Sequence, residues 1–188
     1  MESIKKEGII LVDKPRDITS HDVVDFVRKK LGIKKVGHAG TLDPLADGLL
    51  IILVGSYTKL FPKFVNFDKE YCGMLKLGEV TTTGDSQGEV TVKKDYQGIN
   101  EDSIRQAFSS FVGDVEQIPP MVSALRVKGR RLYNLARKGI VVERPARKIK
   151  IYELKIIKIE VPFVEFYTRC SKGTYIRKLA EDIGEVLG

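Results

Sequence analysis

The sequence lacks the features that define several classes of protein. It has no run of eighteen apolar residues, so it predicts no membrane-spanning helix. Its two cysteines, Cys72 and Cys170, lie far apart without the spacing of metal ligands. We therefore expect free, buried thiols in a reducing compartment, and the cytoplasm as the location. No nucleotide-binding or metal-binding motif is present either, so we expect neither a cofactor nor a metal.

The length and the pattern of the chain predict one substantial domain. With 188 residues, 43% of them hydrophobic, it can bury a sizeable core. Strands are predicted at 8–12, 34–36, 48–54, 69–77, 89–92, 147–160 and 163–170. Helices are predicted from an N-cap at Ser20 to residue 31, from 58, at 100–111, near 132–136 and from 174. Because strands and helices do not alternate regularly, the pattern indicates an α+β fold with a mixed sheet.

The most informative stretch is the octet GHAGTLDP at residues 37–44. Asp43 stands between turn-forming residues, and two glycines precede it. An apolar run starts at Leu49, so the Asp43 carboxylate is expected on a loop directly before a buried strand, where catalytic residues are often found. An isolated Asp-Pro pair more often only holds a turn. The whole octet instead favours a functional role for Asp43.

The positive charge of the chain is concentrated in one segment. Residues 126–150 contain ten basic residues and a single acid, Glu143, so the net charge of this segment is +9. The net charge of the whole chain is +7, so the other residues together carry −2. A local patch of this density suits a polyanion such as nucleic acid. A solvated helix face is the alternative interpretation, and the charge density disfavours it.

The octet, with Gly48 and residues 55–59 after it, resembles the signature of the TruB-type tRNA pseudouridine synthases. Further blocks typical of this family follow in family order and span nearly all of the chain, at 14–15, 19–21, 69–71, 119–124 and 173–177. The resemblance implies the pseudouridine synthase fold, a largely antiparallel central sheet flanked by helices, in one catalytic domain over residues 1–188. It also implies an isomerase that converts a uridine in the T loop of tRNA (position 55) to pseudouridine by base flipping and aspartate-dependent C-glycoside formation.

The resemblance assigns roles to particular residues. The reaction needs a carboxylate that acts covalently or as a base, and Asp43 is expected to be that group. Its attack on ribose, its attack on uracil and its action as a base in an elimination all remain open. Arg177 is the implied charge partner of Asp43. Tyr71 is expected on the floor of the sheet, where it is implied to stack on uracil and to take part in proton transfer. His38 is the implied side chain that fills the gap left by the flipped base. The expected substrate pocket is completed by Lys14, Gly40, Thr41 and Tyr175.

The resemblance also implies an RNA clamp, formed by an insertion at about 119–147 that closes on the T arm of tRNA. Phosphate contacts are expected from Arg126, Lys128, Arg130, Arg131 and Lys138. The long basic stretch favours the stand-alone branch of the superfamily over the guide-RNA-dependent branch, so we expect a monomer with no guide RNA and no obligate protein partner. A non-catalytic RNA-binding module is the alternative function. The joint presence of Asp43, Tyr71 and Arg177, the three expected catalytic residues, argues against it.

The sequence departs from the family pattern at three places. Asp17 stands where the family has Gly in its Lys-Pro-x-Gly block, and Tyr57 replaces a small residue. The resemblance also implies relatives that continue beyond Gly188 with the rest of the catalytic domain and a small RNA-binding domain of the PUA type. We expect that C-terminal part to be absent here, which affects the affinity for tRNA.

Overall fold

The computed structural model describes residues 6–127 and 129–188. The chain forms two compact units, Met1–Phe67 and Asp68–Gly188, and each has its own hydrophobic core. All strand pairs in the described residues are antiparallel. The expected α+β fold is confirmed. That the two units act as one catalytic domain stays a prediction.

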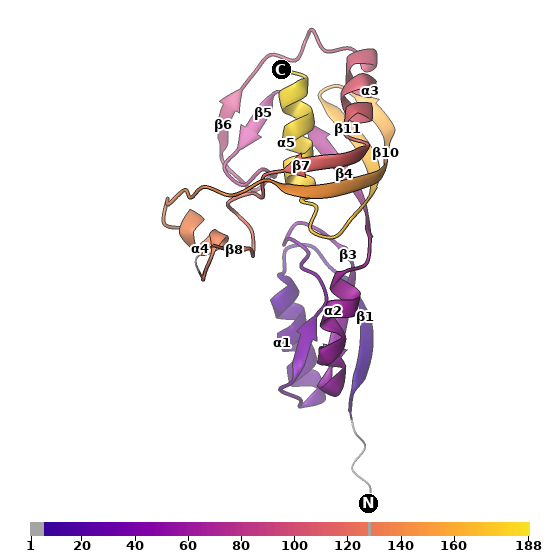
Figure 1. Ribbon diagram of the computed structural model, residues 1–188, viewed down its shortest axis with the longest axis vertical. Helices are drawn as coiled ribbons and strands as arrows, with labels where there is room; N and C mark the ends of the chain where they lie inside the picture. Colours follow the sequence, from indigo (N-terminus) through magenta and orange to yellow (C-terminus); the bar gives the residue numbers. More distant parts are fainter. Residues whose placement is uncertain (1–5, 128) are drawn as a thin grey trace, which may run out of the picture. The chain divides into compact units, whose positions relative to one another are not determined.

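The N-terminal unit is a three-stranded sheet with a helix on one face (Figure 1). Its strand order is β1 (Gly8–Lys14), β3 (Gly48–Val54) and β2 (Val36–His38). Helix α1 (Ser20–Leu31) buries its valines against this sheet. The core that results comprises Val23, Val24, Val27, Val36, Leu50, Ile52 and Val54. Strand β2 begins two residues later than the sequence predicted.

Helix α1 is capped at both ends. The Thr19 hydroxyl accepts the Asp22 N–H, and the Asp22 carboxylate accepts the Thr19 N–H, which completes a capping box. At the other end Gly32 adopts a left-handed conformation with φ 69°. The prediction of Ser20 as the N-cap is wrong by one residue, because the Thr19–Asp22 spacing forms the box and leaves the Ser20 side chain buried.

A short helical segment follows β3. The sequence predicted one helix from about Thr58, whereas the structure has a 3₁₀ helix, η1 (Gly55–Leu60), followed by α2 (Phe61–Val65). Pro62 occupies the first turn of α2, where its missing N–H costs no hydrogen bond.

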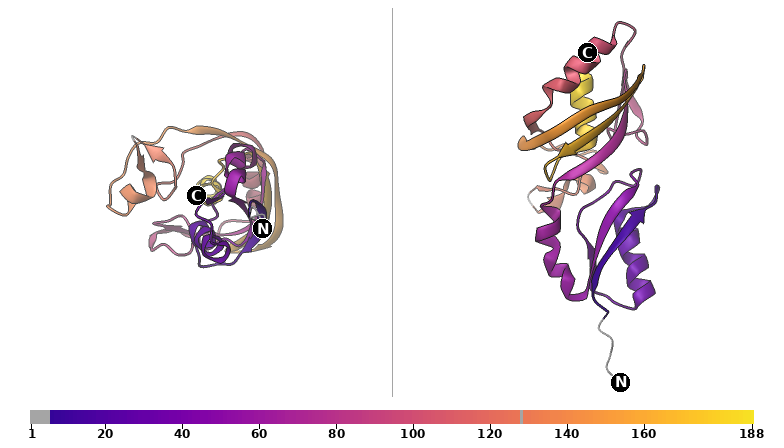
Figure 2. Two further views of the ribbon diagram at one scale, coloured as in Figure 1. Left: turned by 90° about the horizontal axis from the view of Figure 1, so that it is seen from below. Right: turned by 90° about the vertical axis from the view of Figure 1, so that its right-hand side faces the viewer.

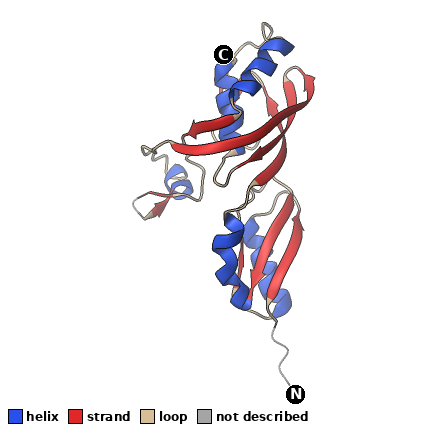
Figure 3. Cartoon of the chain, turned by 45° about the vertical axis from the view of Figure 1, so that its right-hand side comes forward, coloured by secondary structure: helices blue, strands red, loops and turns tan. Residues whose placement is uncertain are grey.

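The C-terminal unit is built on a four-stranded sheet whose one face is covered by two helices (Figures 2 and 3). The helices are α3 (Glu101–Ser110) and α5 (Ile176–Val186). The Phe108 and Phe166 rings meet edge to face in the core, with centroids 5.8 Å apart. The strand order is β4 (Lys69–Lys76), β11 (Phe163–Cys170), β10 (Arg147–Glu160) and β7 (Gly113–Gln117).

Two small hairpins complete this unit. One pairs β5 (Glu79–Thr81) with β6 (Val90–Lys93), and the other pairs β8 (Arg126–Val127) with β9 (Arg130–Arg131). Helix α4 (Leu132–Ala136), which the sequence predicted, follows β9 directly.

Two further findings concern the features that the sequence lacks. Within the described residues, no helix is long and apolar enough to cross a membrane, and no group of three or more His, Cys, Asp or Glu could hold a metal ion. Both thiols are free, but only Cys170 is buried. The prediction of a buried Cys72 is wrong, because this residue lies on the exposed face of β4.

Candidate active site

The octet forms the end of β2 and the loop that leads to β3. The Ala39 N–H donates to the Ile51 carbonyl at 2.9 Å, which ties the start of the loop to the sheet. The Ala46 N–H donates to the Asp43 carbonyl at 3.0 Å and closes a turn around Pro44. Asp43 is half-buried in this turn, at the position before the strand that the sequence predicted.

Two buried polar side chains, Ser20 and Lys14, hold the Asp43 loop through hydrogen bonds to its backbone. The Ser20 hydroxyl donates to the Leu42 carbonyl at 3.0 Å and accepts the Leu42 N–H at 2.9 Å. Ser20 is only 2% exposed, so both hydrogen bonds are shielded from water. The residue next to Asp43 is therefore fixed at both of its backbone polar groups.

Lys14 is the second anchor. Its Nζ donates to the carbonyls of Pro15 at 2.8 Å, Ile18 at 2.8 Å and Pro44 at 3.3 Å, and the side chain is fully buried. An ammonium group has three donors, and all three are used within this loop region. Lys14 therefore shapes the floor under Asp43.

Burial lowers the pKa of Lys14, while the carboxylates of Asp47, Asp17 and Asp43 act in the opposite direction. These carboxylates all belong to the N-terminal unit and lie on the loops that Lys14 joins. The negative charge around the anchor favours its protonated form, which is the form that donates three hydrogen bonds.

Asp17 explains one departure from the family pattern. Its φ is +66°, a left-handed conformation that L side chains rarely adopt, and its N–H donates to the Pro44 carbonyl at 2.8 Å. Glycine adopts this conformation without strain, and aspartate is among the few other residues that tolerate it. The loop thus keeps its geometry without the glycine.

His38 and its neighbours form the entrance to the loop. The half-buried His38 ring places Nδ1 2.5 Å from the Gly40 carbonyl, so Nδ1 carries the proton and donates. Burial lowers the pKa of His38, which favours a neutral ring with Nε2 as an acceptor. Gly40 has φ +125°, which L side chains rarely adopt, and Thr41 is exposed. The expected contact of His38 with a flipped nucleotide stays a prediction.

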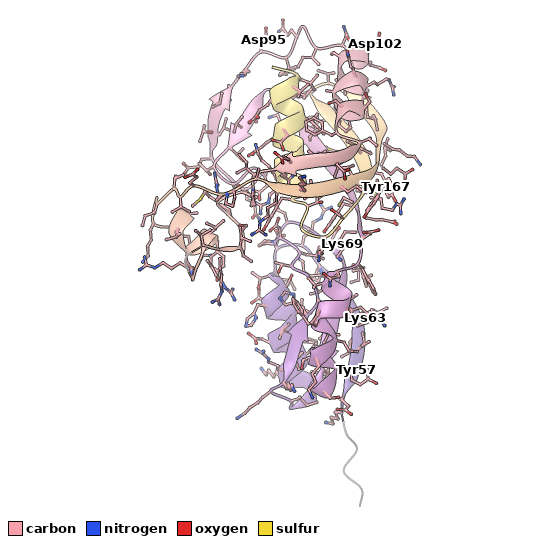
Figure 4. The ribbon with its side chains drawn as sticks, viewed as in Figure 1. Tyr57, Lys63, Lys69, Asp95, Asp102 and Tyr167 are labelled. Carbon is pink, nitrogen blue, oxygen red and sulfur yellow. The ribbon has the colours of Figure 1, made fainter. Side chains whose placement is uncertain are left out.

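Tyr71 lies on the covered face of β4. Its partner across the strand pair is Thr168, and the half-buried ring packs against the core of the C-terminal unit. Tyr167, labelled in Figure 4, lies on the opposite face of the same sheet, next in register to Cys72. Tyr71 therefore has the sheet-floor position that the sequence predicted for it, while its role in stacking stays a prediction.

Arg177, in the first turn of α5, joins two loops of the C-terminal unit. Its Nη1 donates to the Thr83 carbonyl at 2.6 Å, and its Nη2 donates to the Val122 carbonyl at 2.9 Å. Its Nε lies 3.8 Å from an Asp85 carboxylate oxygen, and the Arg177 side chain is only 13% exposed. The guanidinium is thus a partly buried cation with a carboxylate partner inside its own unit.

Sequence reasoning missed Asp85 as that partner. The Thr83 hydroxyl and the Gln87 N–H both donate to Asp85 Oδ1, at 2.5 and 3.1 Å, so the carboxylate also organises its own loop. The sequence did offer a signal for this role, because Asp85 is the single charged residue of the polar loop at residues 81–88.

Gln117 was also missed. Its side-chain amide donates to the Tyr175 carbonyl at 3.1 Å and accepts the Tyr175 N–H at 2.8 Å, and it is 2% exposed. This pair fixes the N-cap residue of α5, two positions before Arg177. The helix begins at Ile176 and not at Thr174 for this reason. A polar residue at an inward position of the strand 113–117 was the signal that could have revealed it.

The basic segment forms a separate small structure in the C-terminal unit. Its anchors are Leu132 and Leu135, which are 0% and 8% exposed. The side chains of Arg126, Arg130, Arg131 and Lys138 are exposed, as expected for phosphate contacts. Lys128 lies outside the described residues.

The predicted site residues fall into two groups. The N-terminal unit holds Lys14, His38, Gly40, Thr41 and Asp43, and the loop contacts bring these five together. The C-terminal unit holds the others, namely Tyr71, Tyr175, Arg177 and the basic residues. Each group has a defined geometry within its own unit.

Comparison with known proteins gives the family. Residues 28–176 match the TruB family pseudouridylate synthase (N terminal domain). The chain is 52% identical over 181 residues to the tRNA pseudouridine synthase B of Clostridium tetani, covering 96% of this chain and 63% of that protein. It is 46% identical over 182 residues to the same enzyme of Opitutus terrae, covering 97% and 76%. The chain thus spans less than two thirds of the Clostridium tetani relative.

Solved structures agree with this. A Cbf5–Nop10–Gar1 complex contains a chain that superimposes with a TM-score of 0.73 at 31% identity, covering 96% of this chain and 44% of that one. An H/ACA RNP bound to a substrate RNA containing 2′-deoxyuridine gives a TM-score of 0.68 at 29% identity, covering 96% and 43%. From the family match and the sequence identity together, the chain belongs to the TruB family of pseudouridylate synthases.

Proposed function

We propose that this chain carries the catalytic residues of a tRNA pseudouridine synthase that converts the T-loop uridine at position 55 to pseudouridine. The observation that carries the proposal is the half-buried Asp43 on a loop fixed by Ser20 and Lys14. The match to enzymes with the name tRNA pseudouridine synthase B supports the choice of substrate. A binding module would have no use for a carboxylate held in this way.

In the proposed reaction, the bond between uracil N1 and ribose C1′ breaks and a bond between uracil C5 and C1′ forms. C5 loses its proton to solvent and N1 takes one up, so uridine and pseudouridine are isomers. Asp43 supplies the carboxylate, by attack on the sugar, by attack on the ring, or as a base. Arg177 stabilises its negative charge, and Tyr71 stacks on the uracil. This requires that the Asp43 loop and Arg177 act on the same nucleotide.

His38 fills the space that the extruded uridine leaves, and Gly40, Thr41 and Tyr175 complete the pocket. The His38 ring, inserted in place of the base, offsets part of the free-energy cost of unstacking, which is a few kcal/mol. The neutral form of His38 suits insertion between bases, because a neutral ring loses less hydration than a charged one.

The basic segment binds the T arm in this proposal. Its cations neutralise phosphates, which position the RNA without reading its sequence. The enzyme acts in the cytoplasm as a monomer, without guide RNA or protein partner. The higher identity to the tRNA pseudouridine synthase B proteins than to the chains in the Cbf5 complexes supports the stand-alone mode.

The test compares the wild type with Asp43→Asn on a T-arm stem-loop and on whole tRNA. Asp43→Asn should lower the rate of pseudouridine formation by about 10⁴-fold or more, because the reacting group is lost while its shape is kept. Tritium release from C5-labelled uridine measures the rate, and RNA binding is measured separately.

Asp25→Asn is the matched control, since Asp25 is an exposed carboxylate of the same unit, paired with Arg28 at 2.9 Å and not among the carboxylates around Lys14. It should keep nearly full activity. Equal rates for the wild type and Asp43→Asn contradict the role of Asp43. A wild type that forms no pseudouridine on either RNA contradicts the proposed function.

A further inference from the structure

Tyr133 in helix α4 contacts two arginines of the basic segment. The Cζ atoms of Arg131 and Arg137 lie 5.8 and 5.6 Å from the centre of the Tyr133 ring, within the range of cation–π attraction. Arg131 Nη1 also donates to the Tyr133 hydroxyl at 3.2 Å. The ring is therefore committed to two guanidinium groups, a role that the sequence did not indicate for it.

The backbone around Tyr133 is fixed by local contacts. The Tyr133 N–H donates to the Ser123 carbonyl at 3.0 Å, and the Leu132 N–H donates to the Leu125 carbonyl at 2.8 Å. Leu132 is fully buried. A ring fixed in this way can hold long side chains that would otherwise sample many rotamers, which reduces the entropy that the arginines lose on binding.

A surface cavity of about 480 Å³ lies beside Tyr133 and Arg131. Its lining includes the cations Arg126, Arg130, Arg131 and Lys138, together with Asn134 and Tyr133, and among the described residues no acidic side chain lines it. The volume lies in the range of pockets that hold small ligands, and the charge suits an anion. Guanidinium groups bind phosphate with two parallel hydrogen bonds, which a fixed orientation favours.

We propose that Tyr133 is a positioning residue that holds Arg131 and Arg137 toward phosphodiester groups of bound RNA, with the adjacent cavity taking a stretch of the RNA backbone. The ring orders the two arginines and does not stack on a base. This rests on the proposed function, and it adds Arg137 to the residues that contact RNA.

The salt dependence of RNA binding tests this, because the slope of log Kd against log salt counts neutralised phosphates at about 0.7–0.9 each. We compare the wild type with Tyr133→Leu and Tyr133→Phe, using a T-arm stem-loop. Tyr133→Leu should reduce the slope by about 1 to 2 and weaken binding about tenfold at 0.15 M salt. Tyr133→Phe keeps the ring, so its slope should stay near that of the wild type.

Two further variants keep the proposal testable if Tyr133→Leu unfolds. Arg137→Gln changes an exposed side chain and should lower the slope by about one phosphate. Tyr152→Leu is the matched control, since Arg169 lies 5.1 Å from the Tyr152 ring outside the basic segment. It should leave the slope and the affinity unchanged. Thermal unfolding of every variant checks that the fold is intact.

The outcomes separate this proposal from the proposed function. Weaker binding by Tyr133→Leu with an unchanged slope means that the ring stacks on a base, and this overturns the proposal while the proposed function stands. An unchanged slope for Arg137→Gln overturns it as well. A wild type without salt-dependent binding to RNA overturns both.

Discussion

The octet loop at residues 37–44 and the basic segment at residues 126–150 use charged and polar groups in opposite ways. The loop carries one half-buried carboxylate, and the side chains that fix it, Ser20 and Lys14, are 2% and 0% exposed. The basic segment carries +9, and its arginines at 126, 130 and 131 are exposed. Each hydrogen bond of the loop joins one defined pair of groups, whereas the charges of the basic segment act together as one field.

The difference concerns which forces set each function. Buried hydrogen bonds are not screened by salt and cost the full desolvation of their partners when broken. Exposed charges act through a summed field that salt screens within about 10 Å. Substitutions that weaken the loop should therefore lower the catalytic rate at any salt concentration. Substitutions in the basic segment should lower the affinity for RNA, most strongly at low salt. Three predictions test this contrast.

The largest effect is expected from Lys14→Met, which keeps the side-chain length and removes three hydrogen bonds to carbonyls. The free energy of unfolding should fall by about 2–4 kcal/mol, because the carbonyls of Pro15 and Ile18 lose their ammonium donor. The Pro44 carbonyl keeps the Asp17 N–H. The value of kcat should fall by about 100-fold through displacement of the Asp43 loop. Chemical denaturation and steady-state kinetics at 0.05 and 0.5 M salt measure the two effects.

Lys59→Met is its control, because Lys59 is an exposed lysine of the same unit. It should change neither quantity. A normal kcat for Lys14→Met shows that the loop is held without its buried anchor, and the contrast between the two regions then fails.

The second effect is expected from the double variant Arg130→Ala/Arg131→Ala. The loss of two phosphate contacts should weaken RNA binding about 20-fold at 0.15 M salt and lower the salt slope by about 1.4–1.8. The value of kcat at saturating RNA should stay within a few-fold of the wild type. An equal loss of affinity at low and high salt removes the basic segment from RNA binding.

The smallest effect is expected from Ser20→Ala. Loss of both hydrogen bonds to Leu42 should cost about 1–2 kcal/mol of stability and lower kcat about tenfold, with KM nearly unchanged. Ser109→Ala is the matched control, since the exposed Ser109 hydroxyl also bonds to a carbonyl, that of Gln106. A change in KM alone for Ser20→Ala assigns Ser20 to RNA binding and contradicts an anchoring role.

The elements that the sequence predicted well are those with a strong local pattern. Strands β3, β10 and β11 have the predicted bounds, because an apolar run or an alternating pattern ended by turn residues specifies a strand locally. The errors include β2, which begins two residues late, and the helix starts, where several residues can cap. Thr19 and not Ser20 caps α1, because the Ser20 hydroxyl is bonded to the distant Leu42. Helix α5 begins two residues late, because Gln117 holds Tyr175.

The site shows the same division. The octet, the arginine of the last helix and the basic segment are visible as sequence patterns, so Asp43, Arg177 and the cations could be named from the sequence. The sequence could not reveal that Ser20 holds Leu42, that Asp85 faces Arg177 or that Tyr133 holds two arginines. The sequence alone determined the residue types and the family, because these depend on local order. Only the tertiary structure decided which polar groups are buried together, because partners such as Ser20 and Leu42 are 22 positions apart along the chain.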